Sequence, residues 1–155
     1  MISNKSDLSK SKVELKDNIE INNRKYIVDG IKVVLDPNKK EIQTALWLSK
    51  KLNKRVEMLP RILMPENIKT SDYLINGEHW DLKTIISNRS DAIRNRIKNQ
   101  ESQASNFIID ISKSKITLKS AEKQINDLYA LKGYKWVKTI IIKNNNVIKI
   151  IHKKS

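Results

Sequence analysis

The sequence has no cysteine among its 155 residues. Disulfide frameworks and thiolate metal sites are therefore excluded, and the composition suits a reducing compartment. Long apolar runs are also absent, because stretches such as "TIII" are far shorter than the roughly 20 residues of a membrane-spanning helix. The first residues, "MISNKSDLSKSK", contain no apolar segment of the kind found in secretory signals. We therefore expect a soluble chain without an export signal of its own, acting in the cytoplasm after delivery by an undefined route.

Acidic residues are scarce, with 17 Asp and Glu against 31 Lys and Arg, which gives a formal charge of +14. Such an excess of positive charge is typical of proteins whose partner is rich in phosphate. A membrane surface is the rival partner, but it calls for a basic amphipathic helix or a lipidation motif, and the sequence offers neither. The composition therefore favours nucleic acid, without separating RNA from DNA.

Domain organisation follows from composition and periodicity. Residues 1–22 are mostly small, polar or charged and are expected to form a flexible leader or linker stub. Residues 23–155 are expected to form a single domain. It begins with a turn at Asp29 and Gly30 between β-branched runs, which gives a small hairpin or an extended entry. The remaining pattern predicts a helix, three strands, a helix, a strand, a helix closed by Gly133, and two strands joined around Asn144. This order indicates a mixed α/β domain with a central mixed sheet flanked by helices.

The first predicted helix lies in "KKEIQTALWLSKKLNKRV", residues 39–56, where apolar residues recur at helical spacing. Glu41 borders the apolar side and would point toward the sheet. A glutamate in the first helical turn is also favoured by the helix dipole alone. Glu41 is therefore either a helix-stabilising residue or a member of a site.

A second helix is predicted from a cap at Ser90 through residues 91–105. Its basic side carries Arg94, Arg96 and Lys98, which would face the backbone of a polynucleotide or simply solvent. Gln103 lies near the end of the same segment.

A hairpin is predicted in "SDYLINGEHWDLKT", residues 71–84, because Asn76 and Gly77 suit a two-residue type I′ turn. In that register Asp72 lies directly opposite Asp81, and period-two alternation puts Lys83 on the same face. Like charges opposite each other destabilise a sheet. Either these groups form a screened cluster at a solvent-exposed edge, or the carboxylates hold a divalent metal such as Mg²⁺. In the second case Lys83 would neutralise charge on a reacting phosphate. His79, a lone histidine near a turn, is expected to make a hydrogen bond only.

Glu41 on a helix, Asp72 on a strand and Asp81-Leu82-Lys83 on the next strand resemble the PD-(D/E)xK nuclease motif. The runs "EIQTALWLSKKLNKRVEMLPRI", "IKTSDYLINGEHWDLKT" and "QASNFIIDIS" are similar to the C-terminal tRNA-nuclease domain of contact-dependent growth inhibition toxins of the CdiA type. The resemblance covers residues 25–155, with Ser71 where that family often has proline. It implies a restriction-endonuclease-like core in which Asp72 and Asp81 bind metal, Lys83 is catalytic and Glu41 completes the site. It also assigns Gln103 a supporting role in nucleic-acid binding.

The sequence therefore predicts an endonuclease dependent on Mg²⁺ or another divalent cation, with RNA, and tRNA in particular, as its substrate. For a toxin of this kind, an acidic immunity protein is an expected partner. Two alternatives stay open: a DNA endonuclease of a phage or mobile element, and a non-catalytic nucleic-acid-binding or virion-associated protein.

Overall fold

The computed structural model describes residues 11–153, which fall into two compact units divided between His79 and Trp80. Helices and a large mixed sheet build the fold, which confirms the predicted mixed α/β class. Among residues 11–153, none of the helices combines the length and the apolar character required to cross a bilayer.

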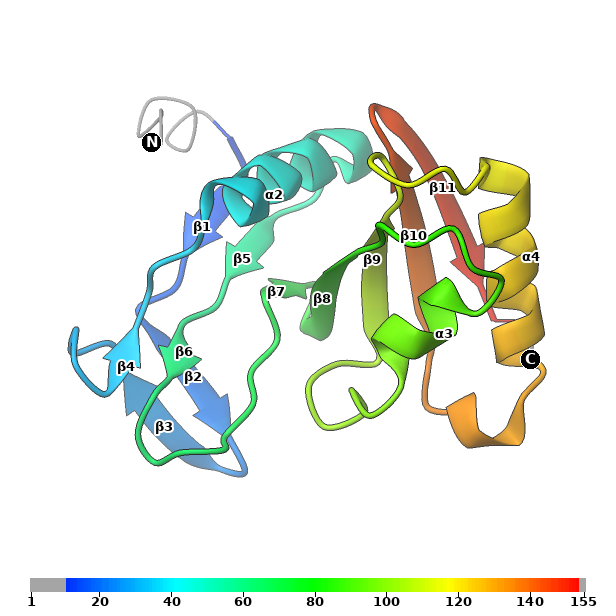
Figure 1. The fold of residues 1–155 in the computed structure, drawn as a ribbon. Helices are drawn as coiled ribbons and strands as arrows, with labels where there is room; N and C mark the ends of the chain where they lie inside the picture. Colours follow the sequence, from blue (N-terminus) through cyan, green and yellow to red (C-terminus); the bar gives the residue numbers. More distant parts are fainter. Residues whose placement is uncertain (1–10, 154–155) are drawn as a thin grey trace. The chain divides into compact units, whose positions relative to one another are not determined.

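The first unit places one helix against three strands of the sheet. β1 (Val13–Leu15) runs parallel to β5 (Val56–Met58), and β5 runs antiparallel to β7 (Tyr73–Ile75). Helix α2 (Lys39–Leu52) contacts β1 and β5 (Figure 1). Its buried side follows the predicted helical spacing and includes Ile42, Ala45 and Leu48.

Two short antiparallel pairs form a second layer in this unit. β2 (Asn18–Ile21) pairs with β3 (Arg24–Ile27), and β4 (Val33–Val34) pairs with β6 (Arg61–Ile62). Their core consists of Ile19, Val33 and Ile62.

The expected leader and first hairpin need correction. Residues 1–10 lie outside the described residues, but β1 and the whole of β2 fall within residues 11–22, so this part of the expected flexible leader is folded. The hairpin turns at Asn22 and Asn23, both at positive φ, because asparagine tolerates the left-handed conformation. Asp29 and Gly30 instead join β3 to β4, which pairs with β6. That residues 23–155 act as one nuclease domain stays a prediction.

The second unit contains the other four strands of the large sheet. β8 (Glu78–Thr84, begun at the end of the first unit), β9 (Asn106–Asp110) and β10 (Thr139–Asn144) are parallel neighbours. The antiparallel β11 (Val147–His152) forms the edge, as predicted. Helices α3 (Ala92–Ile97) and α4 (Leu118–Tyr129) contact each other, and α4 contacts β10 (Figure 1). The hydrophobic core of this unit includes Ile93, Phe107, Ile125 and Ile140.

Two helix boundaries in this unit differ from those predicted. α3 ends at Ile97 rather than extending to residue 105, and its N-cap is Asp91, not Ser90. α4 ends at Tyr129, while Gly133 lies in a separate 3₁₀ turn, η1 (Lys132–Tyr134). Gly133 therefore does not close α4.

Candidate active site

The predicted turn before β8 is present. Asn76 and Gly77 both have positive φ, at 52° and 77°, as a type I′ turn requires. This turn fixes where β8 begins, and therefore which of its residues face the core. Trp80 is buried with only 7% of its surface exposed, as expected for the apolar side of the strand.

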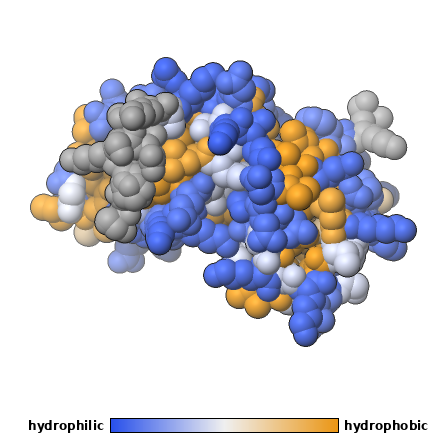
Figure 2. All heavy atoms as spheres, turned by 90° about the horizontal axis from the view of Figure 1, so that it is seen from above, coloured by the Kyte–Doolittle hydropathy of each residue, from blue (hydrophilic) through white to orange (hydrophobic). Residues whose placement is uncertain are grey.

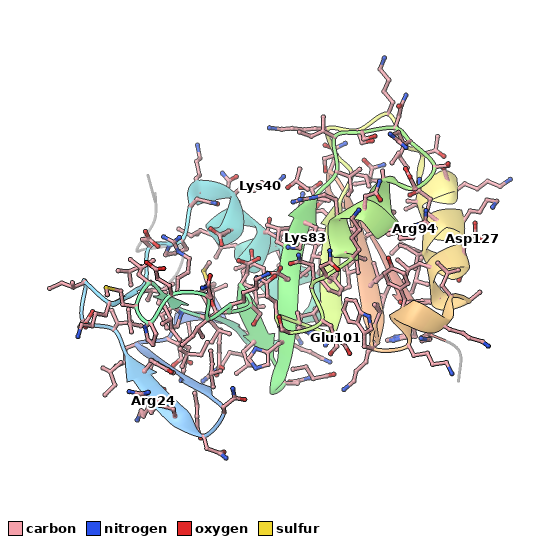
Figure 3. The ribbon with its side chains drawn as sticks, turned by 60° about the horizontal axis from the view of Figure 1, so that its bottom comes forward. Arg24, Lys40, Lys83, Arg94, Glu101 and Asp127 are labelled. Carbon is pink, nitrogen blue, oxygen red and sulfur yellow. The ribbon has the colours of Figure 1, made fainter. Side chains whose placement is uncertain are left out.

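Asp81 and Lys83 form a buried ion pair on β8. Asp81 is 3% exposed, and its Oδ2 lies 2.8 Å from the ammonium nitrogen of Lys83, a residue that Figure 3 labels. The side chain of Lys83 is itself only 13% exposed. A screened cluster at a solvent-exposed edge is therefore the wrong description of these two residues. Because a buried charge that loses its partner is strongly destabilising, each group needs the other.

Gln100 is the second partner of the Lys83 ammonium. Lys83 Nζ donates a hydrogen bond to Gln100 Oε1 over 2.9 Å. With Asp81 Oδ2 and Gln100 Oε1 both accepting from it, the ammonium is held in one position. The second unit thus presents a carboxylate, an ammonium and an amide as one connected group.

Sequence reasoning missed Gln100, and the resemblance indicated Gln103 instead. Both residues were placed in a helix that was extended too far. α3 ends at Ile97 and Asn99 takes a positive φ of 67°, which reverses the chain. Gln100 lies in the resulting turn, where its carbonyl accepts from the N–H of Gln103 over 2.9 Å. A left-handed asparagine is the only signal that could have indicated this turn. Gln103 is half-buried there, and its supporting role stays a prediction.

Glu41, in the first unit, caps helix α2. This is the helix-stabilising role that was one of its two expected roles. The backbone N–H of Asn38 donates to Glu41 Oε1 over 3.0 Å, while the N–H of Glu41 donates to Asn38 Oδ1 over 2.8 Å. Together these two bonds make a capping box. The Tyr73 hydroxyl donates to the Glu41 carbonyl over 2.7 Å, which ties α2 to β7. A direct role of the Glu41 carboxylate in chemistry stays a prediction.

Asp72 lies at the start of β7, beside a serine–histidine contact. Ser71 is buried, and its Oγ is 2.7 Å from His79 Nδ1. This contact confirms the hydrogen-bonding role expected of His79. It also restrains the side chain of Ser71, at the position where the family that the sequence resembles often has proline. The Asp72 carbonyl accepts from the N–H of Leu59 over 3.1 Å. The placement of Asp72 opposite Asp81 stays a prediction.

Burial lowers the pKa of His79 below its usual value near 6.5. His79 is an exposed residue by its surface area, yet the atoms around its ring keep enough water away to disfavour the charged form. His79 is therefore mainly neutral at physiological pH.

The chemistry of the carboxylates fits a hard cation. Among residues 11–153, no three His, Cys, Asp or Glu side chains are grouped so that they could hold a metal ion. A metal at Asp81 would therefore draw on one or two carboxylates of this chain and complete its coordination with water and phosphate oxygens. That is the mode of binding typical of Mg²⁺. Binding of such an ion by Asp72 and Asp81 stays a prediction.

The predicted basic side chains are exposed. Arg94 and Arg96 lie on the outer side of α3, and Lys98 follows its last turn. Much of the face shown in Figure 2 is likewise hydrophilic. Arg94 also lines a hollow of about 330 Å³ with Asp91 and Asp127, so its surroundings carry both signs of charge. Contact of these three side chains with a nucleic acid stays a prediction.

Comparisons with known proteins give two matches. The model of the family described as "Contact-dependent growth inhibition CdiA C-terminal domain" matches residues 69–148, a range that contains Asp72, Asp81, Lys83 and Gln100. The solved structure of a "CdiA-CT/CdiI toxin and immunity complex from Burkholderia pseudomallei" is similar with a TM-score of 0.57 and 30% identity. The similarity covers 73% of this chain and 82% of the matched chain. Comparison with curated proteins gives no match.

Proposed function

Because the chain belongs to the contact-dependent growth inhibition CdiA C-terminal domain family, a family of toxin domains, we propose that it kills as a metal-dependent endonuclease acting on tRNA. The single observation that supports a catalytic role most strongly is the buried contact of Asp81 with Lys83, held by Gln100. A chain with no chemistry to perform gains little from such a group, since apolar residues of similar size stabilise a protein as well or better. In this proposal the site belongs to a nuclease core of the PD-(D/E)xK type.

Each residue of the proposed site has a separate task. Asp81, together with Asp72, binds the divalent cation, and a bound Mg²⁺ would supply Lewis-acid stabilisation of charge on the scissile phosphate. Lys83 contributes a fixed ammonium that neutralises the extra negative charge of the transition state. Gln100 keeps that ammonium in position, which matters because a lysine side chain has four rotatable bonds. Glu41 completes the site in this proposal.

RNA is proposed as the substrate because of the resemblance to the tRNA-nuclease toxin domains alone. The net charge of +14 supports a nucleic acid as substrate without separating RNA from DNA. The exposed Arg94, Arg96 and Lys98 would bind phosphates along the substrate, with Gln103 in support. A DNA endonuclease would use the same chemistry and is the second candidate. A binding protein without activity would have no use for the Asp81–Lys83–Gln100 contacts.

An immunity protein is proposed as a partner, because the similar solved structure is a toxin and immunity complex. We expect this partner to be acidic, since opposite charges accelerate association with a strongly basic toxin. In this proposal the toxin acts inside a target cell after delivery, and its producer survives through the inhibitor.

The substrate is tested by incubating the purified chain with total tRNA and, separately, with plasmid DNA, each in Mg²⁺ and in EDTA. Defined tRNA fragments in Mg²⁺ only would support the proposal. Nicked or linear plasmid together with intact tRNA would favour the second candidate, a DNA endonuclease. Uncut substrates in every tube would overturn the catalytic proposal.

A further inference from the structure

Four exposed aliphatic side chains gather in the first unit, at the β3–β4 connection and the segment after β6. Ile27 is 61% exposed, Ile31 76%, Leu63 44% and Met64 55%. These are four of the nine large hydrophobic residues that are exposed among residues 11–153. We call this set the apolar platform. Exposed apolar groups that cluster in this way mark interaction surfaces.

Hydrogen bonds hold the platform in shape. Lys32 carbonyl oxygen accepts from the N–H groups of Leu63 and Met64 over 2.7 and 3.2 Å, which joins the two segments. The Asp29 carboxylate accepts from the N–H groups of Ile31 and Lys32 over 2.8 and 2.7 Å, which fixes the loop that exposes Ile31. A hollow of about 440 Å³ lies here, with Ile27 and Met64 in its lining. The exposure of these side chains is therefore built into the backbone of the unit.

The polar residues around the platform are mainly cationic. Arg24, Lys25 and Lys32 line the same hollow, and Arg24 lies on the β2–β3 hairpin (Figure 3). Asp29 is the one acidic residue in the lining, and its carboxylate faces the backbone N–H groups of its own loop. An occupant of this surface would therefore meet aliphatic side chains and positive charge together.

We propose that the apolar platform and its cationic rim dock the chain on an anionic lipid surface. Aliphatic side chains would enter the boundary between headgroups and acyl chains, while Arg24, Lys25 and Lys32 contact lipid phosphates. A protein partner would be a poorer fit, because protein interfaces depend on buried aromatic anchors and the four exposed platform residues are aliphatic. A nucleic acid is also a poorer fit, since single strands bind by stacking on aromatic rings and the exposed platform residues are aliphatic.

The sequence offers no basic amphipathic helix, which is the usual means of peripheral membrane binding. The platform provides the same combination of apolar and cationic groups from two segments that are far apart in sequence, residues 24–32 and 63–64. The inference does not depend on the proposed nuclease activity.

Because the chain lacks cysteine, a single introduced thiol can carry an environment-sensitive fluorophore. Ile31→Cys and Met64→Cys place the label on the platform, and Ile86→Cys places it at a residue of equal exposure, 75%, in the second unit. Each labelled protein is titrated with phosphatidylglycerol vesicles and with phosphatidylcholine vesicles. We expect a blue shift at positions 31 and 64 with the anionic vesicles only, and none at position 86.

The charge requirement is tested with Lys25→Gln/Lys32→Gln, which should weaken binding to anionic vesicles roughly 30-fold. The matched control, Lys50→Gln/Lys51→Gln, removes two exposed lysines from α2 in the same unit and should weaken binding much less. Equal losses of vesicle binding in the two double variants, or equal blue shifts at positions 31 and 86, would overturn the proposal. Binding would then reflect only the attraction between the net positive charge of the chain and the anionic vesicles. A shift on adding the cognate immunity protein, with none on adding vesicles, would also overturn it and make the platform a protein interface.

Discussion

One lysine nitrogen links three groups in the second unit, and its contacts define what each residue can do. Lys83 Nζ donates to Gln100 Oε1 at 2.9 Å and lies 2.8 Å from Asp81 Oδ2. A group that must neutralise developing charge works best when it is already in place, because no reorganisation is then required during the reaction. In the proposed mechanism the amide of Gln100 therefore acts through Lys83.

Gln100→Ala tests this positioning. We expect cleavage to fall about tenfold, the loss that corresponds to one positioning hydrogen bond. The loss should lie in kcat, with KM nearly unchanged, because the amide fixes Lys83 and does not bind substrate.

Gln103→Ala is the matched control from the same turn, and we expect it to raise KM if Gln103 supports nucleic-acid binding. A larger loss of kcat in Gln103→Ala than in Gln100→Ala would assign the positioning role to Gln103 and not to Gln100.

The lowered pKa of His79 gives a pH dependence of stability. Its folded pKa lies below the unfolded value near 6.5, so the unfolded chain binds more protons between the two values. The free energy of unfolding should therefore fall as pH drops through 6.5 and should be constant for this group above about pH 7. Urea unfolding of the wild type and His79→Gln between pH 5 and 8 measures this. Parallel curves for the two proteins would show that His79 does not titrate differently on folding.

At the scale of the secondary-structure element, α2 shows how one residue can have two roles. Its capping box uses the Glu41 carboxylate and the Asn38 amide, and both satisfy N–H groups that a helix leaves without intrahelical partners. The same carboxylate is proposed to complete the active site. Substitution by alanine would confuse the two roles, because it removes both the cap and the charge.

Glu41→Gln separates them, since glutamine can replace glutamate in a capping box but carries no charge. We expect Glu41→Gln to be nearly as stable as the wild type and to lose most of the cleavage activity. Asn38→Ala should lose about 1 kcal/mol of stability and keep its activity. Thermal unfolding and an RNA-cleavage assay on both variants provide the measurements. Full activity in Glu41→Gln would leave Glu41 with the helix cap alone.

Elements with strong local signals were predictable from sequence. Helical spacing indicated α2, the apolar run "FII" within "NFIIDIS" indicated β9, and Asn76 with Gly77 indicated the turn before β8. Each of these depends on a few neighbouring residues, so local preference and final structure agree.

Other features depended on contacts between segments that are distant in sequence, and the local sequence pattern does not reveal such contacts. Val33 lies in a short strand that pairs with Ile62, 29 positions away, so the expected hairpin at Asp29 and Gly30 did not form. α3 stopped at Ile97 because the chain reverses at Asn99, and this reversal brings Gln100 to Lys83. The carboxylate and lysine of the site were thus predictable from spacing, whereas the amide required the folded turn.

At the scale of the whole molecule, the net charge of +14 and the local chemistry support the same proposal for different reasons. The charge attracts a polyanion over distances of about 10 Å at moderate ionic strength, and it carries no sequence information. The Asp81–Lys83–Gln100 contacts provide the groups for reaction at one phosphate. Family membership identifies the chain as a toxin domain. In the proposed function this toxin would bind tRNA broadly through charge and cut it at one site.

The central claim is that Asp81 is catalytic, and the initial rate of tRNA cleavage by Asp81→Asn tests it most directly. Asparagine keeps the size of the side chain and removes the charge that would bind a cation, and circular dichroism provides a check that the variant is folded. In Mg²⁺ the wild type should cut tRNA into defined fragments, and Asp81→Asn should be slower by at least about a hundredfold. Equal rates for the folded variant and the wild type would contradict the account.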